Sequence, residues 1–184
     1  MLPISPDMRH SLPSLIRTPR RSGTRALLAG LAAAAAVMLL PASAPAAPLA
    51  HLNGNKAVAA KGAPDVIKDM IRAGNRIRDE RYKWGGGHGD WDDTGYDCSG
   101  AVSYVLHTAG LLDSPLVSGD FMKWGRGGAG RQVTIYASKE HVFMVVAGLR
   151  WDTSYITDGD KSGPGWSEYM RPTKGFRVRH PAGL

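Results

Sequence analysis

Apolar residues recur with two different periods along this chain, and the period changes past its middle. Residues 64–81 follow a helical spacing, and residues 98–109 do so again. Later segments alternate in type or are rich in β-branched and aromatic residues, as strands are: 132–137, 141–148, 149–155 and 176–180. Helices followed by a group of adjacent short strands predict an α+β domain, with helices packed against an antiparallel sheet.

The second of these helices begins at the only cysteine in the chain, Cys98. One continuous apolar face runs along it: Cys98, Ala101, Val102, Val105, Leu106 and Ala109. A helix N-terminus favours a thiolate, because its amide dipoles face the negative charge, and the same N–H groups can hold an oxyanion. We also expect Gly100 to let a substrate approach the backbone. The alternative is that Cys98 is a small buried hydrophobic residue.

The first 46 residues have the pattern of a signal peptide. Five arginines precede a run of fifteen apolar residues at 26–40, which is shorter than the roughly 20 that cross a bilayer. Ala44 and Ala46 then occupy the positions that a signal peptidase reads, with Met8 as an alternative start. We therefore expect a secreted or periplasmic bacterial protein, with a linker over 47–63 and one domain over 64–184.

The charge of the chain depends on this segment. The formal net charge is +7, but five of the 23 basic residues and one of the 16 acidic residues precede the expected cleavage site. The remainder carries 18 basic and 15 acidic residues, a net charge of +3. This scattered charge argues against a nucleic-acid partner and fits a mild attraction to an acidic surface such as a bacterial wall.

Export also restricts the role of Cys98. Outside the cytosol structural cysteines normally form disulfides in pairs, and one thiol cannot staple the fold of its own chain. Cys98 therefore pairs between molecules, is buried and inert, or acts as a nucleophile.

A thiolate enzyme needs a histidine as base and proton donor. His141 stands at the start of the most hydrophobic strand, where a polar ring can face a cleft. If residues 147–148 form a two-residue turn, His141 shares a sheet face with Arg150 and Asp152, and Asp152 is predicted to orient the imidazole. A three-residue turn would reverse that face. The other histidines have less suitable positions: His10, His51, His88, His107 and His180.

Two further motifs do not predict a ligand. The G-x-G-x-x-G run at 125–130 precedes a strand, whereas a dinucleotide-binding loop opens a helix. The acidic segment 90–95 resembles the start of a calcium loop, but its twelfth position is Ala101, where a glutamate belongs. We expect no cofactor and no metal.

Three motifs resemble those of the NlpC-type cell-wall cysteine peptidases, a papain-like family. They are Tyr82-x-Trp84-Gly85-Gly86, then Asp97-Cys98-Ser99-Gly100, and then His141-Val142 at the start of a strand. The resemblance covers about residues 64–179. It implies a papain-like fold and hydrolysis of peptide bonds in peptidoglycan stem peptides, often between a D-γ-glutamyl residue and a diamino acid.

The resemblance also implies a role for each matching residue. Cys98 would be the nucleophile and His141 the base, and Tyr82 would lie beside the nucleophile and the oxyanion site. Asp97 and Ser99 would shape the pocket for the amino end of the substrate. The family often has a histidine as third polar residue, sometimes an asparagine or glutamine, where this chain has Asp152. The segments 88–93 and 111–131 also depart from the usual pattern.

Overall fold

The computed structural model describes residues 48–154 and 163–184. The expected signal peptide and the last residue of the strand expected over 149–155 lie outside these ranges. Within them, no helix combines the length and the apolar composition that crossing a membrane requires.

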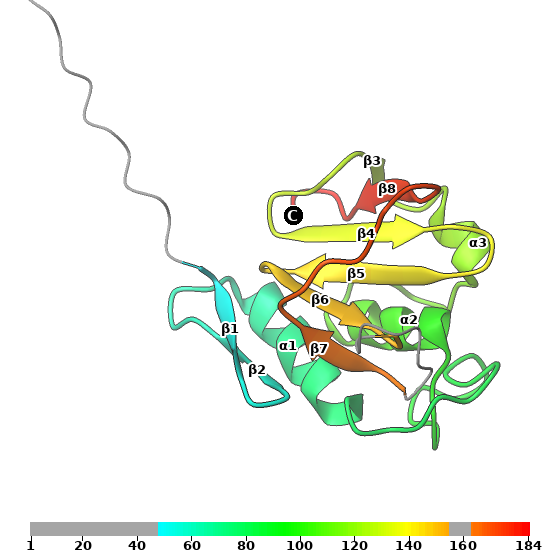
Figure 1. The fold of residues 1–184 in the computed structure, drawn as a ribbon, viewed down its shortest axis with the longest axis horizontal. Coiled ribbons are helices and arrows are strands. Elements are labelled where there is room, and N and C mark those ends of the chain that lie inside the picture. The colour runs from blue at the N-terminus through cyan, green and yellow to red at the C-terminus, as the bar shows by residue number, and fades with distance from the viewer. Residues whose placement is uncertain (1–47, 155–162) are drawn as a thin grey trace, which may run out of the picture. The chain divides into compact units, whose positions relative to one another are not determined.

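The domain places helices against an antiparallel sheet, as predicted (Figure 1). The sheet has the strand order β3-β8-β4-β5-β6-β7, and every neighbouring pair is antiparallel. The helices are α1 (Asp65–Ile77), α2 (Cys98–Thr108) and the short α3 (Ser118–Phe121). The strands are β3 (Arg126–Gly127), β4 (Val133–Ala137), β5 (Val142–Val146), β6 (Leu149–Asp152), β7 (Gly165–Ser167) and β8 (Arg177–His180).

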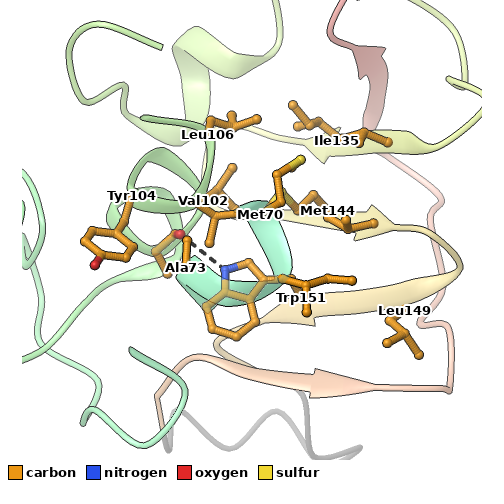
Figure 2. Close-up of a cluster of buried hydrophobic side chains, with 14 of the residues drawn as sticks. Met70, Ala73, Val102, Tyr104, Leu106, Ile135, Met144, Leu149 and Trp151 are labelled. Carbon is orange, nitrogen blue, oxygen red and sulfur yellow. Dashed lines mark hydrogen bonds between the residues drawn. The ribbon is translucent and has the colours of Figure 1, made fainter. Parts of the chain in front are cut away.

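The core lies where α1 and α2 meet one face of the sheet (Figure 2). Met70 of α1, Val102 of α2 and Met144 of β5 are buried there. Trp151 of β6 adds a directional contact, because its indole Nε1 donates a hydrogen bond to the Ala101 carbonyl at 3.2 Å. The apolar face predicted for α2 is thus the face that packs on the sheet, and Cys98 lies at its N-terminal end.

Several predicted boundaries shift. The first helix ends at Ile77, before the expected residue 81, and the four expected strands are shorter by one to three residues within the described ranges. The elements α3, β3 and β7 were not predicted. They have two to four residues each, which is too short for an apolar period to show in the sequence.

The prediction of a linker over 47–63 is wrong for its described part. Residues Ala50–Asn53 (β1) and Lys56–Ala59 (β2) form an antiparallel hairpin, and Gly54 turns it with a φ of 61°. Asn75 of α1 fixes the hairpin to the domain, because its side chain donates to the Ala57 carbonyl at 2.7 Å and accepts from the Ala57 N–H at 3.0 Å. These bonds join positions 18 residues apart, so local composition does not reveal them.

Gly74 provides a test of the packing of α1 on the sheet. A Cβ atom at Gly74 would overlap the indole of Trp166, which is buried against Trp151. Alanine normally stabilises a helix interior, but overpacking here should outweigh that gain and lower the free energy of unfolding by about 1–3 kcal/mol. Urea unfolding of Gly74→Ala measures the loss. Gly62→Ala is the control, since no atom lies within 4 Å of its added Cβ; equal stability of the two variants would contradict the packing described.

Candidate active site

Cys98 lies in the first turn of α2, where the helix is capped by Asp97. The Asp97 carboxylate accepts hydrogen bonds from the Gly100 N–H at 2.7 Å and the Ser99 hydroxyl at 3.0 Å. Cys98 is 9% exposed and lines an open cavity of about 460 Å³, together with Tyr82, Trp84, Ser99 and Lys139 among others. The helix therefore presents a partly accessible sulfur to a space large enough for part of a ligand.

His141 and Asp152 are brought together by the β5–β6 hairpin. Val146 pairs with Leu149, and Ala147 and Gly148 have positive φ values of 53° and 91°. This is the two-residue turn that was predicted, so the expected sheet face is confirmed. Asp152 Oδ1 lies 2.9 Å from His141 Nε2, and the Asp152 side chain is fully buried.

The electrostatics of this pair favour two charged groups. Burial opposes the charge on His141, but hydrogen bonds to Asp152 and to the Cys98 side chain outweigh burial and raise the pKa of the imidazole to about 9. Burial also opposes the charge on Asp152, yet His141, the Ser154 N–H and Arg171 hold its pKa below the ordinary value. At neutral pH an imidazolium therefore lies between a carboxylate and the sulfur of Cys98.

Two arginines lie beside this carboxylate. Arg171 Nη1 is 3.0 Å from Asp152 Oδ2 and also 3.0 Å from His141 Nε2. Arg150 Nε is 3.5 Å from the same Oδ2, and its guanidinium is buried. The sequence placed Arg150 on the same sheet face as Asp152. It did not predict Arg171, which follows β7 in a segment without any apolar period.

Tyr82 lies close to the nucleophile, as the resemblance implied. Its pKa is raised first by burial and then by the negative charges of Cys98 and Asp97, so its phenol is near both groups. Tyr82 also lines the cavity beside Cys98. Its hydroxyl is therefore close to the atoms that would carry charge during attack on a carbonyl.

Asp97 and Ser99 line the same cavity, but both already have partners. His88 Nε2 lies 3.1 Å from Asp97 Oδ1 and 3.1 Å from the Ser99 hydroxyl, and the Gly85 N–H donates to Asp97 Oδ2 at 3.1 Å. The substrate contacts implied for these two residues stay a prediction, with the added condition that His88 shares them.

The glycine-rich loop 82–97 also occupies the space beside Gly100. A Cβ atom at Gly100 would overlap the Gly86 carbonyl, so this glycine admits the backbone of the chain itself. The expectation that Gly100 serves the approach of a substrate is therefore wrong. Trp91 of the same loop stacks on His107 of α2 with ring centroids 3.9 Å apart, which fixes the acidic segment 88–93 to the helix.

Comparison with solved structures gives several matches. The peptidoglycan hydrolase RipB of Mycobacterium tuberculosis is 25% identical, with 63% of this chain and 64% of that chain covered and a TM-score of 0.49. An NlpC/P60 family protein of Bacillus cereus is 18% identical, with 62% and 39% covered and a TM-score of 0.47. RipD of M. tuberculosis, described as a non-catalytic NlpC/p60 domain protein adapted to peptidoglycan binding, is 20% identical, with 62% and 96% covered and a TM-score of 0.47.

The B. cereus protein and RipD are both described as NlpC/P60 proteins. The chain spans less than two thirds of the length of RipB and of the B. cereus protein. No family model matches the sequence, and no curated protein does either.

The cap of α2 can be tested through stability. Asp97→Ala removes the side chain that accepts the first-turn N–H and holds the loop at Gly85, so we expect the free energy of unfolding to fall by about 1–2 kcal/mol. Asp113→Ala, at an exposed loop position, is the control and should change it little. Urea unfolding of both variants provides the measurement. If Asp97→Ala leaves the free energy of unfolding unchanged, the capping role is ruled out.

The raised pKa of His141 predicts a pH dependence of stability. Folding raises this pKa from 6.5 to about 9, so the stabilisation is complete below pH 6.5 and is lost as the pH rises through about 9. The free energy of unfolding should therefore fall between about pH 6 and about pH 10, and fall less in His141→Gln. The same pH dependence in both proteins would show that His141 does not gain its proton affinity on folding.

Proposed function

We propose that this protein is an exported cysteine peptidase that hydrolyses peptide bonds in peptidoglycan stem peptides. The observation that carries the proposal is the series of three polar groups, Cys98, His141 and Asp152, of which Cys98 lines an open cavity. A thiol at a helix start, an imidazole beside it and a buried carboxylate behind the imidazole have the geometry of a nucleophile, a base and an orienting group.

The geometry supports a specific order of proton movements. Nε2 of His141 is occupied by Asp152, which leaves Nδ1 for Cys98. In the imidazolium, Nδ1 already holds the proton that Cys98 gives up, so the sulfur attacks the substrate carbonyl as a thiolate and gives a tetrahedral oxyanion. The nearby donors for that oxyanion are the Tyr82 hydroxyl and the first-turn N–H groups of α2 other than that of Gly100, which donates to Asp97. The oxyanion collapses as Nδ1–H protonates the leaving amine, and a water molecule, deprotonated by Nδ1, then hydrolyses the thioester.

The substrate class rests on the motifs shared with the NlpC-type peptidases. We expect cleavage between a D-γ-glutamyl residue and a diamino acid, with the amino end of the peptide near Asp97 and Ser99. The cavity supports a peptide ligand, because it combines the exposed Trp84 ring with the charged side chains of Lys139 and Glu140. A peptide backbone and an ammonium or carboxylate group can each find a partner there.

The experiment is digestion of defined muropeptides by the purified protein, with the products identified by mass. Cys98→Ala and His141→Ala should each lower the rate by about 10³-fold or more, because nucleophile and base act as a unit. His51→Ala is the matched control, since His51 is exposed on the β1–β2 hairpin. Folded protein that releases no peptide from any peptidoglycan would overturn the proposal.

Two alternatives predict other outcomes. Amide hydrolysis or acyl transfer on another substrate would leave muropeptides intact or would add an acyl group to an acceptor, and product masses distinguish these results from hydrolysis. A non-catalytic wall-binding module would bind peptidoglycan without cleavage. In that case Cys98 should react with iodoacetamide no faster than a free thiol at neutral pH, whereas a thiolate paired with His141 should react faster.

A further inference from the structure

Arg171 contacts two members of the candidate catalytic group through one nitrogen. Its Nη1 lies 3.0 Å from Asp152 Oδ2 and 3.0 Å from His141 Nε2. The guanidinium carbon is 5.5 Å from the centroid of the Phe143 ring and 5.9 Å from that of Phe176. Two aromatic rings and a buried carboxylate thus hold the side chain, which is 29% exposed.

The two contacts of Arg171 cannot both be hydrogen bonds while His141 is charged. Arginine has donors only, and Nε2 of an imidazolium is also a donor. When Nε2–H donates to Asp152 Oδ1, Arg171 therefore donates to Oδ2 alone. The carboxylate then bridges the imidazole and the guanidinium, with one oxygen for each.

This bridge has a consequence for proton transfer. A buried carboxylate with no other counter-charge would hold the imidazolium so strongly that it became a poor proton donor to a leaving amine, because general acids work best near the operating pH. A cation at the second oxygen offsets that effect and still leaves the first oxygen to orient the ring.

We propose that Arg171 is a positioning residue, which offsets part of the charge of Asp152 at Oδ2 and so weakens the hold of the carboxylate on the His141 imidazolium. The inference deepens the proposed function, on which its catalytic part rests. It also accounts for how an aspartate can stand where the NlpC-type family often has an uncharged side chain.

Other groups around His141 also affect its charge and enter the test. Arg150 also lies beside the carboxylate, with its Nε 3.5 Å from Oδ2 and its Nη2 donating to the Ser154 carbonyl at 3.1 Å. Further ionisable groups on the packed elements are Cys98 on α2, Tyr82 on the loop before it, and Lys139 and Glu140 on the β4–β5 turn. Tyr136 of β4 is another, since its ring stacks on that of Phe143. None of these is changed in the variants below, so their contribution is constant.

The test is a double-mutant cycle on Arg171 and Asp152, read by NMR titration of the His141 ring in the purified protein. Arg171→Met should raise the titration midpoint by about 1 pH unit, because it removes a cation beside Nε2. Asp152→Asn should lower the midpoint, because it leaves both arginines without the carboxylate. The double variant should lie between the two, with only Arg150 left as a nearby cation. Such opposite and compensating shifts support the proposal, and an unchanged midpoint in Arg171→Met overturns it.

Two further variants separate charge from structure. Arg171→Lys keeps the cation and should keep the titration midpoint of His141 close to that of the unchanged protein. This variant can be measured even if Arg171→Met does not fold. A midpoint of Arg171→Lys raised by about 1 pH unit, as expected for loss of the cation, overturns the proposal. Arg131→Met is the matched control, because residue 131 precedes β4 at the end of the sheet opposite to His141 and is exposed. It should shift nothing.

Muropeptide hydrolysis is measured in the same set. We expect Arg171→Met to lose activity, mainly in kcat, and the double variant to recover part of it relative to Asp152→Asn. Equal losses in all three variants, with unshifted titrations, would assign Arg171 a structural role only. The titration needs no substrate, so a protein that hydrolyses no peptidoglycan but shows the predicted shifts would contradict the proposed function and leave the role of Arg171 intact.

Discussion

The packing of α2 on β5 and β6 is the constraint on which the site depends. Buried side chains such as Val102 and Met144 fill the interface. The hydrogen bond from Trp151 to the Ala101 carbonyl fixes the position of α2 along the direction of the strands. Hydrophobic packing alone tolerates small slides, whereas a buried indole N–H without its acceptor is costly. The same register sets the helix start, and with it Cys98, opposite the start of β5 and His141.

Charge in this site is balanced over a short distance. One carboxylate, Asp152, contacts an imidazole and two guanidinium groups, and its side chain is fully buried. Such a buried anion is stable only with partners. The arginines and His141 therefore stabilise the charge of Asp152, and Asp152 in turn orients their side chains. The raised pKa of His141 and the lowered pKa of Asp152 are two results of this one arrangement.

The glycine-rich loop 82–97 is part of the site through its contacts with the start of α2. The sequence predicted that Asp97 and Gly100 meet a ligand, but much of their space is taken by the chain itself, through the Gly85 N–H, the Gly86 carbonyl and His88. These contacts join the loop to α2 and so make the cap of the helix and the wall of the cavity one structure. Position and residue type in a motif do not tell whether a polar group faces a substrate or its own backbone.

Periodicity and local chemistry were enough to predict the α+β class, the helix that starts at Cys98 and the turn that aligns His141 with Asp152, because each depends on neighbours within about a dozen residues. The β1–β2 hairpin was missed because Asn75 holds it from a distant helix, and Arg171 was missed because its segment has no regular structure. The sequence by itself thus determined which groups can do the chemistry. Only the tertiary structure decided which charges surround them, because burial and contacts between distant segments set the strength of every electrostatic interaction in the site.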